Sequence, residues 1–208
     1  MRIPDIRLML WAVPLALSLS GVAPAGAQEN QTSDLPAAGF GTLRQESILI
    51  GLRAASLEIQ VVPLDERVIR LLAPDTYASL HRLVENRARE IELVAERYGL
   101  RSPKLFLVTF FGRQAQARFE PEFLTITSQN RLFRVLEILP LSPLWSGRQL
   151  SQRETATAIY VFEDGIRILD PMTVAYSTIT NDTWVATLRR LDRERASVIA
   201  RAARRNPR

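Results

Sequence analysis

The chain of 208 residues has no cysteine and a single histidine, His81. Without cysteine there can be no disulfide, no thiol nucleophile and no thiolate metal ligand, so an exported protein of this composition must obtain its stability from packing. A zinc site would need ligands other than His81, and a Ser-His-Asp triad would have to use it without any G-x-S-x-G elbow in the chain. We therefore expect no metal and no triad chemistry.

Several ligand-binding signatures are missing as well. The chain has no P-loop, no dinucleotide-binding fingerprint, no D-x-D-x-D-G calcium loop and no internal repeat. His81 is followed one helical turn later by Glu85, and the simplest interpretation of this H-x-x-x-E pattern is a hydrogen bond between neighbours on a helix. Half of a metal site or an oriented base is the alternative. We expect no cofactor.

Long apolar runs are confined to the N-terminus. Residues 1–27 show a basic beginning, an apolar run from Leu8 to about Leu19 and a small-residue end at Ala25-Gly26-Ala27, which is the pattern of a secretory signal peptide with an A-x-A cleavage site. A membrane anchor is disfavoured because the run is short and contains Pro14. We expect a secreted or periplasmic protein with no transmembrane span after cleavage.

The net charge of +5 is unevenly distributed. Residues 184–208 hold eight arginines against two carboxylates, a net charge of +6, and residues 1–27 contribute +1, so residues 28–183 sum to −2. Any electrostatic attraction of a partner therefore belongs to the C-terminal segment.

The body of the chain is patterned as short strands. Residues 28–41 are small and polar and suggest a flexible leader. Lys104 to Gly112 is apolar, β-branched and aromatic, and predicts a central strand that is buried on both faces. Asp65-Glu66 and Asp164-Gly165 suggest hairpin turns. We expect further strands at residues 42–52, 57–61, 67–72, 123–127, 132–139, 155–162, 166–169 and 172–176.

Two helices are predicted. One spans about residues 75–98, with Pro74 at its start and Gly99 where a left-handed C-terminal cap is favoured. The other spans about 183–203, after Asn181-Asp182-Thr183. Together these elements predict a mainly β fold over residues 42–182, an antiparallel β-sandwich that is immunoglobulin-like in general architecture, with one inserted helix and a basic C-terminal helix and tail over residues 183–208.

The C-terminal helix is the sharpest functional candidate. Its apolar positions predict a docked stripe, and arginines lie broadly opposite, where they can contact lipid headgroup phosphates, envelope polyanions or an acidic protein. A solvated basic face without a partner remains open. Nucleic acid is not expected because no aromatic residues lie among the arginines. The stripe is Trp184, Leu188, Leu191, Val198 and Ile199, and the anion-binding candidates are Arg189, Arg190, Arg193, Arg201 and Arg204.

Loop acids offer a different function. Glu120, Glu122 and Asp164 lie in predicted loops, where a carboxylate pair can run glycoside hydrolysis, although turns favour aspartate for backbone reasons alone. Our leading interpretation is therefore a non-catalytic binding or structural module of the cell envelope with an unknown envelope protein or surface as its partner. The alternatives are a carboxylate-type hydrolase and an accessory protein that binds a polyanion or anionic lipid through the C-terminal helix.

Overall fold

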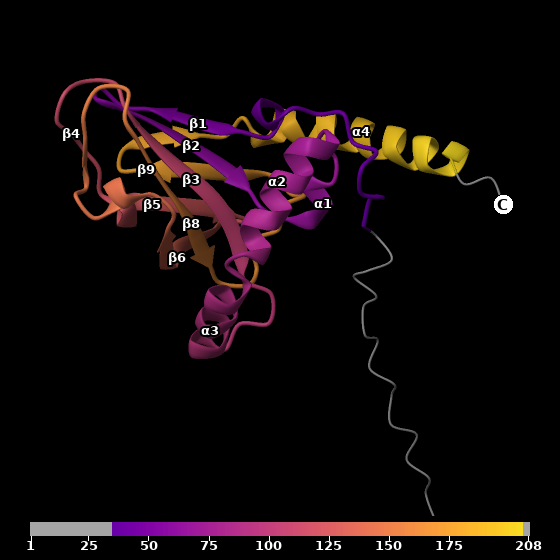
Figure 1. The fold of residues 1–208 in the computed structure, drawn as a ribbon, viewed down its shortest axis with the longest axis horizontal. Coiled ribbons are helices and arrows are strands. Elements are labelled where there is room, and N and C mark those ends of the chain that lie inside the picture. The colour runs from indigo at the N-terminus through magenta and orange to yellow at the C-terminus, as the bar shows by residue number, and fades with distance from the viewer. Residues whose placement is uncertain (1–34, 206–208) are drawn as a thin grey trace, which may run out of the picture. The chain divides into compact units, whose positions relative to one another are not determined.

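A computed structural model describes residues 35–205 (Figure 1). The predicted signal peptide and residues 28–34 of the predicted leader lie outside the described residues. Eight strands form one antiparallel sheet in the order β1-β2-β3-β8-β6-β5-β9-β10, and β4 and β7 form a separate pair. The strands are β1 (Ile50–Arg53), β2 (Leu57–Pro63), β3 (Lys104–Gly112), β4 (Ala117–Arg118), β5 (Leu124–Ser128), β6 (Arg131–Pro140), β7 (Gln149–Leu150), β8 (Thr155–Phe162), β9 (Met172–Tyr176) and β10 (Ile179–Asn181).

The sheet is curled because β6 changes partner along its length. Its first residues, 131–134, pair with β5, and residues 135–140 pair with β8, with a register shift between Val135 and Glu137. The two ends of the strand order, β1 and β10, lie beside each other, and Asn181 Nδ2 donates to the carbonyl of Gly51 at 2.6 Å. The mainly β, antiparallel prediction is confirmed, but the immunoglobulin-like sandwich is not, since one curled sheet replaces two separate ones.

The helices lie outside and at the end of this sheet. They are α1 (Glu66–Ile69), α2 (Pro74–Glu85), α3 (Ala88–Tyr98) and α4 (Trp184–Arg205), with short 3-10 turns at Gln45–Ser47, Pro121–Phe123 and Pro143–Trp145. None of the helices between residues 35 and 205 combines the length and apolar character that a membrane-spanning segment needs.

The predicted helix over 75–98 is two helices, α2 and α3. Pro74 begins α2, and Gly99, with φ of 65°, closes α3 as expected. Asn86 ends α2 with helical backbone angles, and the chain leaves the helical path at Arg87, where φ is −112° and ψ is 8°. These two polar residues interrupt the apolar stripe at the point where another buried side chain would be needed, and asparagine has a low helix propensity.

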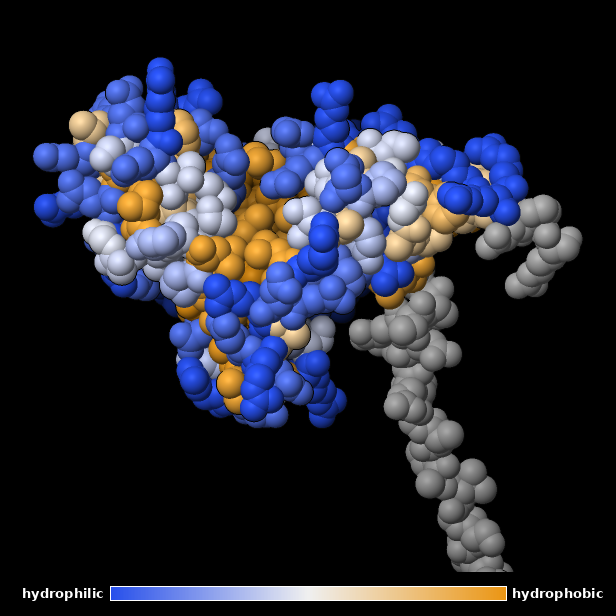
Figure 2. All heavy atoms as spheres, in the orientation of Figure 1, coloured by the Kyte–Doolittle hydropathy of each residue, from blue (hydrophilic) through white to orange (hydrophobic). Residues whose placement is uncertain are grey.

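The predicted central strand is β3. One face of β3 is fully buried in the interior that the curled sheet encloses, and it carries Phe106, Val108 and Phe110. Leu107 and Phe111, on the opposite face, remain half-buried, so the prediction of burial on both faces was too strong. Figure 2 shows apolar side chains gathered in a hollow beside α2, where the helices leave part of this outer face uncovered.

The predicted hairpin at Asp65-Glu66 is wrong. The Asp65 carboxylate accepts a hydrogen bond from the Arg67 backbone N–H at 2.9 Å and caps α1. Val68 and Ile69 are both buried, and a strand with one solvent face would send adjacent side chains to opposite sides. A helical turn places them together.

The predicted hairpin at Asp164-Gly165 is also wrong, since residues 166–169 form no strand. Both edges of β8 are already paired, one with β3 and the other with β6, so no edge is left for a returning strand. Asp164 instead accepts hydrogen bonds from the backbone N–H groups of Arg101 and Ser102 at 2.9 and 3.0 Å.

Residues 35–41, at the end of the predicted flexible leader, contact the body at both ends, while residues 37–39 are exposed. Pro36 and Gly41 are buried. A Cβ at Gly41 would lie 2.3 Å from the backbone of Leu71 and Leu72, so only glycine fits this close approach. The segment is therefore held against the body at Pro36 and Gly41.

Candidate anion-binding surface on the C-terminal helix

The helix α4 is fixed by its apolar face. Trp184, Leu191 and Val198 are almost fully buried, and the Trp184 indole Nε1 donates to the carbonyl of Ile168 at 2.8 Å. The predicted start is confirmed, and Asn181 Oδ1 accepts the Thr183 backbone N–H at 2.8 Å. Because the buried residues recur every seven positions, α4 presents one constant face to the body and leaves the other in water.

Residues 40–42 hold the C-terminal half of α4 in place. The Glu194 carboxylate accepts hydrogen bonds from the backbone N–H and the hydroxyl of Thr42, both at 2.9 Å, and pairs with Arg201. Arg201 Nε also donates to the carbonyl of Phe40 at 2.8 Å, and the Arg205 guanidinium lies 5.7 Å from the centre of the Phe40 ring. Arg201 is thus engaged in holding two segments together.

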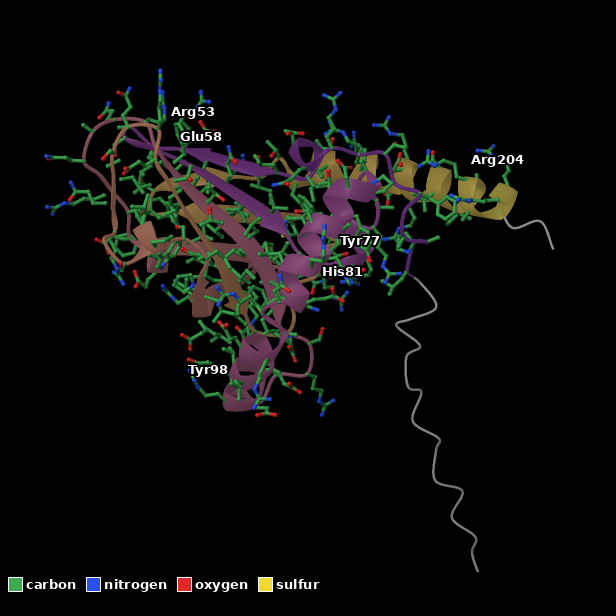
Figure 3. All side chains as sticks on the ribbon, in the orientation of Figure 1. Arg53, Glu58, Tyr77, His81, Tyr98 and Arg204 are labelled. Atoms are coloured by element: carbon green, nitrogen blue, oxygen red, sulfur yellow. The ribbon has the colours of Figure 1, made fainter. Side chains whose placement is uncertain are left out.

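The five arginine candidates separate into two groups. Arg201 is engaged as above, and Arg190 Nη1 donates to the carbonyl of Ser47 at 3.3 Å. Arg189, Arg193 and Arg204 lie exposed on the solvent face, and within residues 35–205 their guanidinium groups make no hydrogen bond or ion pair. Arg204 points away from the helix into solvent in Figure 3. The three form the basic face of α4.

Ile199 does not belong to the docked stripe. The sequence grouped it with Trp184 and Leu191, but its side chain is 61% exposed and Val185 is 44% exposed. At about 100° per residue Ile199 falls at the border of the stripe.

Two of the loop acids share one arginine. Arg148 lies between Glu120 and Glu122, with Nη1 3.3 Å from Glu120 Oε2 and Nη2 2.6 Å from Glu122 Oε1. Asp164 is bound to the loop before β3 and does not join them. The structure therefore brings two of the three predicted acids together, on a shared counter-ion. A cavity of about 280 Å³ lies beside Glu122 and Arg148.

Two tyrosines hold the backbone of the loop that carries Glu120 and Glu122 by hydrogen bonds. The Tyr160 hydroxyl donates to the carbonyl of Pro121 at 3.0 Å, and the Tyr176 hydroxyl accepts the backbone N–H of Glu120 at 2.8 Å. Burial raises the pKa of Tyr160 and of Tyr176 above the ordinary tyrosine value. Both phenols stay neutral at physiological pH and serve as fixed hydrogen-bonding groups.

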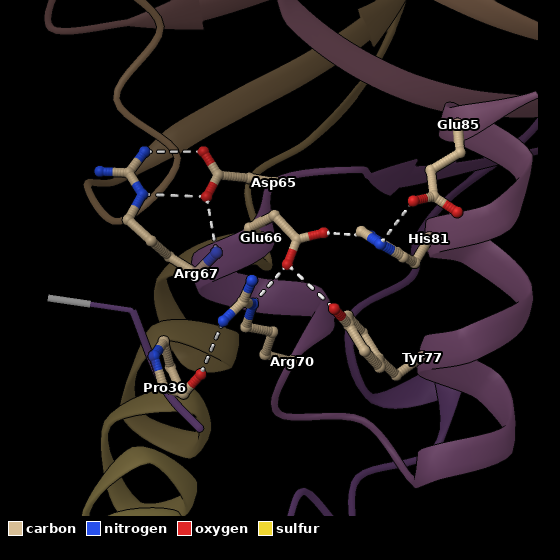
Figure 4. Close-up of polar contacts among 8 residues, drawn as sticks. All are labelled: Pro36, Asp65, Glu66, Arg67, Arg70, Tyr77, His81 and Glu85. Atoms are coloured by element: carbon tan, nitrogen blue, oxygen red, sulfur yellow. Dashed lines mark hydrogen bonds and ion pairs between the residues drawn. The ribbon is translucent and has the colours of Figure 1, made fainter. Parts of the chain in front are cut away.

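His81 lies between two carboxylates (Figure 4). Its Nδ1 is 2.7 Å from Glu66 Oε1, and its Nε2 is 3.2 Å from Glu85 Oε1, which confirms the predicted contact with Glu85. Tyr77 stacks on the imidazole at 5.2 Å, and its hydroxyl donates to Glu66 at 3.3 Å. The sequence did not indicate Glu66, because its approach to His81 depends on how α1 packs on α2.

This cluster is a structural junction between α1, α2 and the N-terminal segment. Arg70 pairs with Glu66 and donates to the carbonyl of Pro36 at 3.4 Å. The hydrogen bond that Arg70 donates to the Glu66 carboxylate holds the pKa of Arg70 above its usual value. The two carboxylates face opposite ring nitrogens of His81, and among residues 35–205 no group of three or more acidic or histidine side chains is arranged to hold a metal ion.

Another cavity, of about 350 Å³, lies where α4 begins. Asp170 and Asp182 are among its lining residues, and Gln129 Nε2 donates to Asp170 at 2.8 Å. Its acidic lining disfavours an anion, so the basic face of α4 is the better candidate for an anionic partner.

Comparison of the chain with protein-family models, curated proteins and solved structures gives no match. The function must therefore be inferred from the residues of this chain.

Proposed function

We propose that the protein is an exported, non-catalytic binding module of the cell envelope and that the basic face of α4 is its contact surface for an anionic partner. The secretory pattern of residues 1–27 supports export. The basic composition of residues 184–208 supports the choice of partner.

One observation carries the proposal: Arg189, Arg193 and Arg204 have no counter-ion among the described residues and share the solvent face of a helix whose other face is fixed. A guanidinium presents a planar fork that matches phosphate and carboxylate groups. Each basic side chain near an anionic surface contributes roughly 1 kcal/mol. Three of them correspond to roughly a hundredfold in affinity.

The test measures retention of the mature chain, from Gln28, on vesicles containing phosphatidylglycerol and on immobilised heparin, at low and high salt. The variant R189Q/R193Q/R204Q is expected to bind about a hundredfold more weakly. The matched control R89Q/R118Q/R153Q removes the same charge from other exposed arginines and should retain most of the affinity.

Equal losses in the two variants would show that binding follows net charge and not the face of α4. An absence of salt-sensitive binding by the wild-type protein would remove the proposal altogether. Thermal unfolding of each variant verifies that the fold is intact. Export is tested separately by sequencing the N-terminus of the protein recovered outside the cytoplasm, where Gln28 is expected first.

A further inference from the structure

The basic face of α4 has an apolar edge. Ile199 is the most exposed of the large apolar side chains in residues 35–205. Val185 is also exposed, at the mouth of the cavity that Asp170 and Asp182 line. On a helix of about 100° per residue these two positions lie close together in angle, on the side of the arginine face next to Arg189. About 21 Å separates them along the helix axis, from a rise of 1.5 Å per residue, so both reach the same plane beside the helix.

Small side chains lie beside this edge and among the arginines. At about 100° per residue Ala203 falls at the angle of Val185, Ala196 between Val185 and Arg189, and Ala200 between Arg189 and Arg193. All three alanines are exposed, and alanine lets the helix backbone approach a flat surface closely. The exposed Asp192 falls on the edge itself, between Val185 and Ile199, and it opposes binding to an anionic surface.

The apolar edge distinguishes between anionic partners. A soluble polyanion contacts the arginines but gives Ile199 and Val185 no apolar environment. The boundary between headgroups and acyl chains provides both, because arginine can keep its guanidinium among the phosphates while apolar side chains leave water.

Other exposed apolar residues have less of this combination. Leu93 lies one turn after the exposed Arg89 on α3, and Leu132 lies two residues before the exposed Arg134 on β6, so each adjoins one arginine for which the described residues provide no counter-ion. On α4 two exposed apolar side chains adjoin three such arginines.

We infer that the partner of α4 is a bilayer with anionic headgroups, on which the helix lies flat. Arg189, Arg193 and Arg204 contact the headgroup phosphates, and Ile199 and Val185 enter the acyl boundary. This inference rests on the proposed function, since it identifies the anionic partner of the same face.

The experiment uses the mature chain with vesicles of phosphatidylglycerol and phosphatidylcholine in equal parts, and with heparin. V185S/I199S is expected to weaken vesicle binding about tenfold and to leave heparin binding unchanged. The control L93S alters a comparably exposed apolar residue on α3 and should leave vesicle binding unchanged. Quenching of the tryptophan in I199W by brominated lipid is a direct measure of insertion, since Trp145 and Trp184 are buried.

The outcomes are separable. If V185S/I199S binds vesicles as tightly as the wild type and I199W is not quenched, the bilayer inference is overturned, while loss of binding in R189Q/R193Q/R204Q would still support an anion-binding face. Tighter binding to heparin than to vesicles, without quenching, would assign a soluble polyanion and also overturn it. If R189Q/R193Q/R204Q keeps its affinity for the anionic vesicles and for heparin, the proposed function fails as well.

Discussion

Two arginine-bearing surfaces of this protein differ in what surrounds the guanidinium groups. Arg148 lies between Glu120 and Glu122, so its charge is already balanced within the fold. Arg189 and Arg193 lie on α4 with no carboxylate partner among the described residues. These arginines therefore differ in their capacity to bind an anion from another molecule, because such an anion would have to displace two carboxylates from Arg148.

The same contrast holds within α4. Arg201 is half-buried, pairs with Glu194 and binds the carbonyl of Phe40, whereas Arg204, three residues later, points into solvent. A count of arginines therefore overstates the binding surface. The fold uses some of them for its own cohesion and leaves the others available.

The largest loss of stability is expected from the side chain that fixes α4 to the body. Trp184→Ala removes a fully buried indole and its hydrogen bond to Ile168, and should lower the free energy of unfolding by about 3–5 kcal/mol. Val185→Ala, at the exposed neighbour, should change it by less than about 0.5 kcal/mol. Urea denaturation measures both, and similar losses would contradict a one-sided attachment of α4.

The next effect concerns the arginine of α4 that is paired. Glu194→Gln removes the charge that binds Arg201 and weakens the bonds to Thr42. Since the Glu194 side chain is only 11% exposed, we expect a loss of about 1–3 kcal/mol in unfolding free energy. Asp192→Asn removes the same charge from the exposed side of the helix and should be nearly neutral. A larger loss of unfolding free energy in Asp192→Asn than in Glu194→Gln would mean that the Asp192 side of α4, and not the Glu194 side, is docked on the body.

A smaller effect, with a pH signature, is expected at the cap of α1. Burial opposes ionisation of Asp65, but the hydrogen bonds and charge of Arg67 outweigh it and hold the Asp65 pKa below its ordinary value of 3.8. The folded state therefore binds this proton less readily than the unfolded chain, so the stabilisation is present above pH 3.8 and is lost as pH falls through the folded pKa.

Asp65→Asn should consequently lower the unfolding free energy by about 1 kcal/mol at neutral pH. The difference from the wild type should shrink below pH 3.8. Denaturant titrations over this range provide the measurement. A difference that stays constant down to the lowest pH would show that the charge of Asp65 is unimportant.

The smallest effect compares the two surfaces directly. Arg148→Gln leaves Glu120 and Glu122 without their shared cation, and should lower the unfolding free energy by about 0.2–1 kcal/mol at low salt, less at high salt. Arg189→Gln removes a cation that no described carboxylate needs and should leave stability unchanged or raise it slightly. Equal destabilisation by the two substitutions would mean that the basic face of α4 has internal partners.

Local patterns predicted much of the fold. The apolar run at Lys104 to Gly112 is a strand with the predicted bounds, β8 matches its predicted range of 155–162, and Gly99 ends a helix. The failures share a cause. Asp65-Glu66 and Asp164-Gly165 resemble hairpin turns, but a hairpin also needs an unpaired edge and a second strand, and these depend on strands that are distant in the chain.

The candidate site was predicted in part for the same reason. Alternation and helical spacing identify the side of α4 that is buried, and so identified the arginines opposite. They do not reveal that Phe40 and Thr42 lie against Arg201 and Glu194, or that Glu66 meets His81. Those contacts join residues far apart in the chain.

The amino-acid order alone determined the β-rich body, the amphipathic C-terminal helix and the concentration of positive charge in it, because periodic burial and composition are local properties. Tertiary structure decided that the strands form one curled sheet. It also decided which arginines bind carboxylates and carbonyls of the fold and are therefore not available to a partner. That second choice depends on which distant segments come into contact, and a charged side chain is available to a partner only where such a contact is missing.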